Sequence, residues 1–412
     1  MPTSPLSLTF SDVIKSNYSQ EKITSLINEF KNHERYDFVR ELKNETLISS
    51  VKNTYERFKH FKSFAQVGIG GSSLGPEMLI SALGSEGVQF TFFNNIDADD
   101  TYQKLKNLNI KETLFYIVSK SGGTAETMAT FSIIANKLVE AGVKEENFKD
   151  HFIFATDPKK SSLLELGKEF GITCLEIPPF VGGRFSVLTP VGTLPALFAR
   201  IDIDSLLAGA YKYATEQFDS EDFKKTCASI LTHAEEGVNE TILMPYSSLL
   251  RDLSFWFVEL WGESLGKKKD NQRIGLTPIP SYGATDQHSQ MQLFMEGPLN
   301  KFLFLIHVKN TKNDFKLENS FNHSRLKMLS SYSLKDLMDA EFFGTLKALS
   351  EQGVPHLTLS IDLVNEESLG AIIVYFELLT AIIGNALGID PFDQPGVEAG
   401  KIYSFEWLEK LK

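Results

Sequence analysis

The residues best suited to bind an anion form one polar stretch, Ser119-Lys120-Ser121-Gly122-Gly123-Thr124-Ala125-Glu126-Thr127. It follows an apolar run at 114–118 and precedes a helix-like segment, so it is expected to join a strand to a helix. Its hydroxyl groups, its lysine and the free N–H groups of a helix N-terminus would favour a negative charge. We interpret the stretch as a phosphate-binding loop formed by Ser119, Lys120, Ser121 and Thr124.

An ordinary turn is the alternative for this loop. Ser, Gly and Thr are common turn and N-cap residues, so the loop taken alone gives both interpretations equal weight. The spacing differs from that of a Walker A loop, and nucleotide binding is not implied. Glu126 is either a favourable charge in a first helical turn or a contact to Lys401.

Three charged residues elsewhere in the chain have the types that acid, base or oxyanion chemistry needs. Arg184 lies in Gly182-Gly183-Arg184-Phe185-Ser186, where small neighbours allow close approach, and a fixed cation there could stabilise an oxyanion. Glu263 follows an aromatic helical segment in which desolvation could raise a carboxyl pKa, as a general base requires. Glu259 lies one helical turn earlier and is an equally good base by composition.

Two further residues have a structural and a functional interpretation. His288, in Thr285-Asp286-Gln287-His288, is either a structural hydrogen-bonding residue near a helix start or an acid/base group. Lys401 follows the proline-bounded segment that begins at Pro391 and is either a surface charge or a group that steadies a sugar ring oxygen. An exposed turn arginine is the corresponding alternative for Arg184.

The composition limits the classes of protein that the chain can belong to. Its 412 residues, 42% of them apolar, are enough for two domains with real cores. A net charge of −12 argues against general nucleic-acid or anionic-membrane binding and requires a local basic pocket for any anionic ligand. Cys174 and Cys227 lack metal-type spacing and suit a reducing compartment. No signal peptide is recognised, and the apolar run 371–387 is expected to be a buried helix.

The elements that must position these residues alternate between strand and helix. The first set of expected strands is 64–69, 90–93, 113–118, 152–155 and 173–177, and the second is 241–244, 276–279, 302–308 and 356–361. Long helices are expected at 247–265 and 366–387. This alternation predicts an α/β fold with two doubly wound, mainly parallel sheets. Ligands bind at the carboxyl ends of such strands, where the glycine turn at 70–73 and the loop at 119–127 both fall.

Four parts are expected along the chain. Residues 1–50 form a helical lead-in, 51–185 a first α/β domain, 186–388 a second α/β domain, and 389–412 a C-terminal segment that carries Lys401. No long flexible linker separates the two domains, so they are expected to pack closely.

Six motifs together resemble the glucose-6-phosphate isomerase family, in its compact bacterial form, and they occur in that family's order. They are residues 68–76, 119–127, 181–186, 262–267, 285–288 and 392–401. The segments Gly-Gly-Arg-Phe-Ser and Phe-Asp-Gln-Pro-Gly-Val-Glu-Ala-Gly-Lys are specific. The resemblance implies two sugar-isomerase domains in a cytoplasmic homodimer that interconverts glucose 6-phosphate and fructose 6-phosphate without cofactor or metal, in glycolysis and gluconeogenesis.

The resemblance also implies a role for each site residue. Glu263 matches the base that moves a proton between C1 and C2 through an enediol(ate), and Arg184 matches the arginine that stabilises the intermediate. His288, donated by the other subunit, and Lys401 match the ring-opening pair. Ser119, Lys120, Ser121 and Thr124 match the phosphate loop, and Gly71, Ser72 and Gln394 match substrate contacts. Gly123 departs from the threonine that is often found there.

Two other functions compete with this one. An isomerase that also accepts mannose 6-phosphate would share every motif. A non-catalytic sugar-phosphate sensor would not need Glu263, Arg184, His288 and Lys401 together, and the chain has no DNA-binding module or basic patch.

Overall fold

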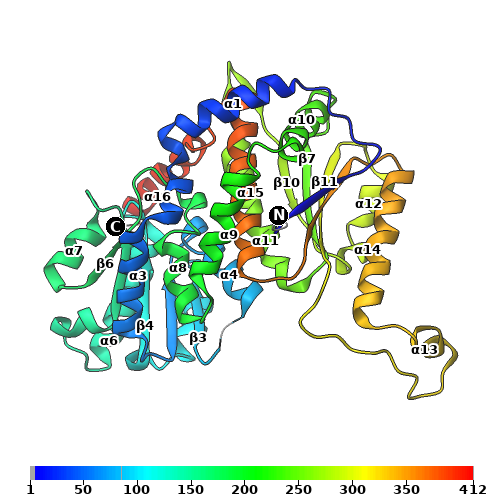
Figure 1. Ribbon diagram of the computed structural model, residues 1–412. Coiled ribbons are helices and arrows are strands. Elements are labelled where there is room, and N and C mark those ends of the chain that lie inside the picture. Colours follow the sequence, from blue (N-terminus) through cyan, green and yellow to red (C-terminus); the bar gives the residue numbers. More distant parts are fainter. Residues whose placement is uncertain (1–4, 85, 412) are drawn as a thin grey trace.

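Two β-sheets, each covered by helices on both faces, form the computed structural model of the protein, which describes residues 5–84 and 86–411 (Figure 1). The first sheet is wholly parallel, with the order β3-β2-β4-β5-β6. Its strands are β2 (Ser63–Val67), β3 (Gln89–Phe93), β4 (Thr113–Val118), β5 (Phe152–Thr156) and β6 (Thr173–Glu176). Every residue of β4 is buried, which explains why this strand is a continuous apolar run.

Helices on the two faces of the first sheet bury alternate strand residues. Phe64, Leu114 and Tyr116 point to the face covered by α3 (Glu45–Phe58) and α8 (Pro190–Phe198). Phe115 and Ile117 point to the opposite face, covered by α6 (Ala125–Glu140) and α7 (Ser162–Phe170). This two-residue alternation is the geometry of a strand with a helical layer on each side.

The second sheet has the order β1-β12-β11-β7-β10, and its four later strands are parallel. They are β7 (Glu240–Pro245), β10 (Thr277–Pro280), β11 (Lys301–Val308) and β12 (His356–Ile361). One face packs on α12 (Met291–Glu296) and α14 (Leu334–Glu351). The other packs on α1 (Gln20–Asn32), α9 (Ile203–Glu216), α10 (Glu221–Glu235), α11 (Arg251–Leu265) and α15 (Glu366–Leu387).

The remaining elements connect or flank these layers. The helices are α2 (Asp37–Arg40), α4 (Leu74–Leu83), α5 (Ala98–Lys106), α13 (Ser324–Leu329) and α16 (Glu398–Glu409), and β8 (Lys267–Lys269) pairs with β9 (Gln272–Ile274). Short 3₁₀ turns are η1 (Glu34–Tyr36), η2 (Glu41–Lys43), η3 (Gly70–Ser72), η4 (Ile110–Glu112), η5 (Glu145–Asp150), η6 (Gly183–Phe185), η7 (Ser248–Leu250), η8 (Thr285–His288) and η9 (Pro395–Val397).

The fold class predicted from the sequence is confirmed, with one correction near the N-terminus. Residues 1–50 were expected to be helical, but β1 (Ser7–Phe10) pairs antiparallel with β12 at the edge of the second sheet. A strand of four residues with half-exposed side chains gives almost no periodic signal, so its pairing partner decides its conformation. The domain boundary at 185/186 stays a prediction, although α8, which follows that boundary in the chain, packs on the first sheet.

The longest apolar helix, α15, lies in the interior. Among the described residues it is the one helix that is long and apolar enough to cross a membrane. Of its most apolar stretch, 89% is buried inside the protein. Gly209 of α9 and Gly370 of α15 let these two helices approach closely. A Cβ atom at Gly370 would lie 2.0 Å from the carbonyl oxygen of Leu206. Helices α9 and α15 therefore pack with their backbones in close contact.

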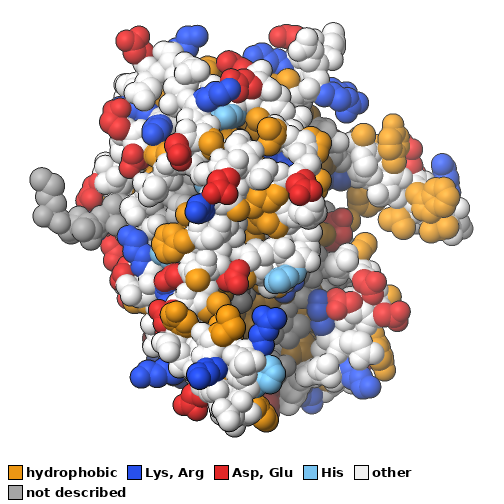
Figure 2. All heavy atoms as spheres, turned by 90° about the vertical axis from the view of Figure 1, so that its right-hand side faces the viewer, with side chains coloured by type: hydrophobic (Ala, Val, Ile, Leu, Met, Phe, Trp, Pro, Cys, Tyr) orange, Lys and Arg blue, Asp and Glu red, His pale blue; other side chains and the backbone are white. Residues whose placement is uncertain are grey.

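Two segments stand out from the body with apolar side chains exposed. Residues 311–333, which carry α13, project at the lower right of Figure 1, and Phe321 there is 86% exposed. Helix α16 contains no buried residue, and Tyr403 and Trp407 are each 65% exposed. Figure 2 shows hydrophobic side chains gathered on the part that projects at the right, and further hydrophobic side chains and charged side chains of both signs scattered over the body.

Candidate active site

A cavity of about 1000 Å³ opens at the carboxyl ends of the first sheet. Its wall is built from η3, the loop after β4, the loop after β5, η6, α11 and the C-terminal segment with α16. The lining residues that the sequence had predicted are Gly71, Ser72, Lys120, Ser121, Thr124, Arg184, Glu263, Gln394 and Lys401. The structure thus brings together residues from six separate parts of the chain.

The loop after β4 forms a compact cluster of hydroxyl groups. The Ser119 and Thr124 hydroxyl oxygens lie 2.9 Å apart, and that of Ser121 lies 3.4 Å from Thr124. Backbone N–H groups of Gly122 and Gly123 donate to the Ser119 and Ser121 hydroxyls. Ser119 is 2% exposed and lies beneath the cavity wall, so it holds Thr124 in place.

Helix α6 begins at this loop and points its N-terminus into the cavity. Thr124 is the N-cap residue, and its side chain makes no capping hydrogen bond. The first N–H groups of α6 therefore remain available to an anion, which the helix dipole also favours. Glu126 lies in the first turn and lines the cavity, whereas the Lys401 ammonium group contacts Glu398 at 2.7 Å. This placement favours the helix-start role of Glu126.

Lys120 is fixed by the backbone on the opposite side of the loop. Its Nζ atom donates to the carbonyl oxygens of Pro179, at 2.6 Å, and Val181, at 2.8 Å. Burial lowers the pKa of Lys120, while Asp157 opposes this shift. Since an ammonium group has three N–H donors, one stays free to bind an anion in the cavity.

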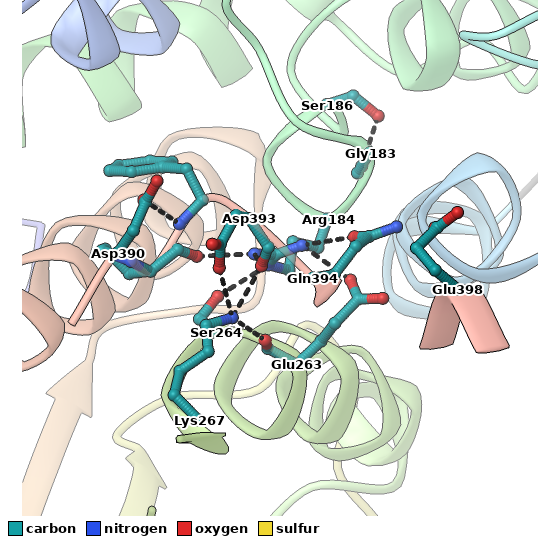
Figure 3. A network of polar contacts seen from close by, with 12 residues as sticks. Gly183, Arg184, Ser186, Glu263, Ser264, Lys267, Asp390, Asp393, Gln394 and Glu398 are labelled. Carbon is teal, nitrogen blue, oxygen red and sulfur yellow. Dashed lines mark hydrogen bonds and ion pairs between the residues drawn. The ribbon is translucent and has the colours of Figure 1, made fainter. Parts of the chain in front are cut away.

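Arg184 is the centre of a polar network at the other end of the cavity (Figure 3). The residue is 2% exposed. Nε donates to Ser264 Oγ at 2.7 Å, and Nη1 donates to Glu263 Oε2 and Gln394 Oε1, both at 2.8 Å. Nη2 donates to the carbonyl oxygens of Pro391 and Asp393. All five guanidinium donors are engaged, so the side chain is rigidly oriented.

Glu263 and Glu259 lie one turn apart on α11 and both line the cavity, but their partners differ. Glu263 is paired with Arg184, and Lys267 Nζ binds its backbone carbonyl oxygen at 2.8 Å. Burial, with Glu263 as the second cause, raises the pKa of Glu259 to about 7. The pairing places Glu263, of the two candidate bases, beside the fixed cation.

Gly71 is required where η3 meets η6. A Cβ atom at this position would lie 2.3 Å from the carbonyl carbon and oxygen of Gly183 and 2.6 Å from the backbone nitrogen of Arg184. No side chain fits at that distance. Gly71 therefore allows the glycine turn and Arg184 to share one wall of the cavity.

Two predicted site residues are absent from the cavity lining formed by the described residues, Ser119, which is buried beneath the wall, and His288. His288 is exposed at the end of η8. Lys401 does line the cavity, but its side chain is 58% exposed and paired with Glu398. The cavity of one chain thus brings together Glu263, Arg184 and the loop after β4 without His288.

Asp157 and Lys160 are two charged lining residues that the sequence interpretation missed. Both lie in the loop after β5, where Asp157 accepts hydrogen bonds from the backbone of Lys159 and Lys160. The signal that could have found them is their position, because this loop also follows a strand of the first sheet.

A parallel α/β core with a hydroxyl-rich anion loop facing a guanidinium–carboxylate pair defines an enzyme site for a small anionic substrate. The model of the family described as phosphoglucose isomerase matches residues 32–412. A glucose-6-phosphate isomerase from Carboxydothermus hydrogenoformans is 37% identical over 388 residues, which cover 89% of this chain and 83% of that relative.

Two solved structures share the fold of this chain. A hypothetical protein from Thermus thermophilus superposes with a TM-score of 0.88 at 31% identity, covering 98% of this chain and all of the other. The fold is also that of a glucose-6-phosphate isomerase from Chlamydia trachomatis, with a TM-score of 0.80 at 22% identity, covering 94% and 78% of the two chains. The chain belongs to the phosphoglucose isomerase family.

Proposed function

We propose that the protein interconverts glucose 6-phosphate and fructose 6-phosphate in this cavity, with the phosphate at the loop after β4 and the reacting carbons beside Glu263. The observation that carries the proposal is the Arg184–Glu263 pair, 2.8 Å between Nη1 and Oε2, in the wall of the cavity whose lining also includes Lys120, Ser121 and Thr124. Binding energy from the phosphate end would position the reacting end.

The proton transfer follows from the placement of these groups. The Glu263 carboxylate removes the proton from C2 of the open-chain aldose, the C1–C2 double bond forms, and the carbonyl electron pair moves to O1. Arg184 stabilises the resulting negative charge. Glu263 then returns the proton to C1, and the O2 hydroxyl loses its proton as the C2 carbonyl forms and O1 gains one. The net change is an aldose converted to a ketose.

Arg184 must release an acceptor for this role. Because its five donors are engaged, a substrate oxygen has to displace or share the hydrogen bond to Gln394 or to Glu263. If the substrate oxygen displaces Gln394 from Arg184, Glu263 stays paired with the arginine. If it displaces Glu263, the base is released. We assign Gln394 as a substrate contact on this ground.

Ring opening and oligomeric state belong to the same proposal. We assign ring opening to Lys401 with His288 of a second copy, in a homodimer. The exposed position of His288 supports this, as do the apolar side chains on the segment 311–333, among them Phe315 at 68% and Met328 at 70% exposure. A cytoplasmic location is also part of the proposal.

A coupled assay tests the function directly. Fructose 6-phosphate is supplied in the presence of a chelator, and formation of glucose 6-phosphate is followed with an auxiliary dehydrogenase. Turnover is expected. Absence of turnover would contradict the isomerase activity, and turnover that the chelator abolishes would contradict metal independence.

A second assay, which detects fructose 6-phosphate, separates the narrow from the broad specificity. Catalytic efficiency is compared for fructose 6-phosphate formation from glucose 6-phosphate and from mannose 6-phosphate. A strong preference for the glucose compound is expected, and comparable efficiencies would replace the narrow assignment with a bifunctional one.

A further inference from the structure

Glu259 is an ionisable group in the cavity wall to which the proton transfer described above gives no task. It lies on α11 one turn before Glu263, and both side chains line the cavity. Its Oε1 atom lies 2.7 Å from the position that a Cβ atom of Gly70 would occupy, so the carboxyl group packs against the η3 backbone. Its Oε2 atom is buried and has no hydrogen-bond partner among the described residues.

The nearby cations do not neutralise a second carboxylate. Arg184 already donates all five N–H groups, and its one carboxylate partner is Glu263. Lys120 binds two carbonyl oxygens, and Lys401 is paired with Glu398. A buried charge without a partner is costly, so this geometry favours the neutral form of the Glu259 carboxyl group.

Burial and the groups around Glu259 have a net effect in the same direction, although not all of them raise its pKa. Burial raises the pKa of Glu259 to about 7, the Glu263 carboxylate adds to the rise, and the Gly71 backbone and Arg184 oppose it. The other elements packed on α11 carry acidic groups with their own surroundings. Glu77 of α4 accepts from Ser73 and Asn94, Glu240 of β7 pairs with Lys301, and Glu377 of α15 is buried.

We propose that Glu259 binds the substrate as a neutral carboxylic acid, donating one hydrogen bond to a sugar oxygen at the reacting end, next to Glu263. The proposal rests on the isomerase function above and adds a substrate contact to it. Glu263, which is paired with Arg184, remains the base. The two glutamates of one helix face would thus have different tasks, one as proton acceptor and the other as hydrogen-bond donor.

This role makes binding depend on pH in a defined direction. A donor is present while Glu259 is protonated and is lost as the pH rises through about 7. The ionised form would also repel developing negative charge on the substrate. Substrate affinity therefore falls on the alkaline side in proportion to the fraction of Glu259 that still carries its proton.

Glu259→Gln and Glu259→Ala are the variants that test the proposal. Glutamine keeps the shape and a hydrogen-bond donor but cannot ionise, whereas alanine loses the donor. We measure kcat/KM for fructose 6-phosphate from pH 6 to 8.5 and take the ratio of each variant to the wild type, because titration of the substrate phosphate cancels in that ratio. The melting temperature of each variant is measured to verify that the variant is folded.

The Gln variant is expected to match the wild type within about threefold at pH 6. The ratio of its kcat/KM to that of the wild type then rises by about 30-fold up to pH 8.5, because the protonated fraction of a group that titrates near 7 falls by that factor in the wild type. The Ala variant is expected to be weak at pH 6. A Gln-to-wild-type ratio that does not change with pH would overturn the proposal, and so would Gln and Ala variants that are equally weak at pH 6.

The outcome also separates this proposal from the function on which it rests. A wild-type protein without turnover on either sugar phosphate would contradict the isomerase function itself. Loss of proton exchange at C2 in Glu259→Gln, with exchange retained in Glu263→Gln, would identify Glu259 as the base and would overturn its role as a neutral donor.

Discussion

The loop after β4 and the Arg184 network face the same cavity but are built in different ways. The loop takes its hydroxyl groups, its lysine and its helix N-terminus from residues 119–125, which are adjacent in the sequence. The network joins Arg184, Glu263 and Gln394, which are separated by 79 residues or more. One end of the cavity is formed by residues that are adjacent in the chain, whereas the other end forms only after the two sheets have packed together.

The two regions differ in the way that substrate binding and reaction would each require. Residues of the loop are polar, adaptable and in part exposed, which suits the phosphate of a substrate that must enter and leave. The side chain of Arg184 is 1% exposed and fixed by five hydrogen bonds, as preorganised electrostatic stabilisation requires. Changes at the network should therefore lower kcat, whereas changes at the loop should raise KM.

Apart from removal of the Glu263 carboxylate, the largest effect is expected from Arg184→Lys. Lysine keeps the positive charge but cannot form the planar fork that binds Glu263, Gln394 and two carbonyl oxygens. We expect kcat to fall by about 100- to 1000-fold, the usual cost of a lost transition-state donor. Steady-state kinetics with fructose 6-phosphate measure kcat and KM. A variant in which KM alone changes would contradict the expectation that changes at the network lower kcat.

Gly71→Ala should have the next largest effect, because it disturbs Arg184 without touching its side chain. The added Cβ atom would lie 2.6 Å from the Arg184 backbone nitrogen, so η3 and η6 must move apart. We expect a clear loss of kcat at a retained fold. Gly344→Ala in α14 is the matched control, since no heavy atom lies within 4 Å of a Cβ atom there and the residue is outside the cavity lining. Equal losses in both variants would contradict the steric explanation.

Lys120→Ala should mainly weaken binding of the phosphorylated sugar. A charge-assisted hydrogen bond contributes about 1.5–3 kcal/mol, which corresponds to a roughly 10- to 100-fold rise in KM. Sorbitol 6-phosphate, which has the phosphate but no carbonyl group, is titrated by calorimetry in parallel. Unchanged affinity for this compound would remove the loop from phosphate binding.

The smallest effect is expected from Lys160→Ala. This lysine lines the cavity but is exposed, and an exposed ion pair contributes about 0.2–1 kcal/mol. KM should rise by a few-fold at low ionic strength and less in salt. Lys159→Ala, in the same loop but outside the cavity lining, is the control and should leave KM unchanged.

The sequence predicts the local parts of this molecule far better than the long-range ones. The strands around the phosphate loop were predicted because the buried run 113–118 and its polar loop are contiguous. The short edge strand 7–10 was missed because its conformation depends on β12. The choice between Glu259 and Glu263 stayed open, since helical periodicity places both on one face and only the position of Arg184 distinguishes them.

Two further features could not follow from sequence patterns. Lys120 was predicted to bind phosphate, and the structure adds that two carbonyl oxygens of residues 179 and 181 hold its ammonium group. Lys401 was matched by its motif, but a motif does not say that its helix stays exposed and that Glu398 pairs with it. Both depend on backbone groups or helix packing that no residue pattern encodes.

Proton exchange at C2 in Glu263→Gln tests the division between binding and reaction most directly. The variant is incubated with glucose 6-phosphate in D₂O, deuterium at C2 is followed by NMR, and binding of sorbitol 6-phosphate is measured beside it. We expect exchange to fall by about 100- to 10,000-fold, the range for a general base, with affinity retained. Exchange at the wild-type rate would contradict the account, because the base would then lie elsewhere.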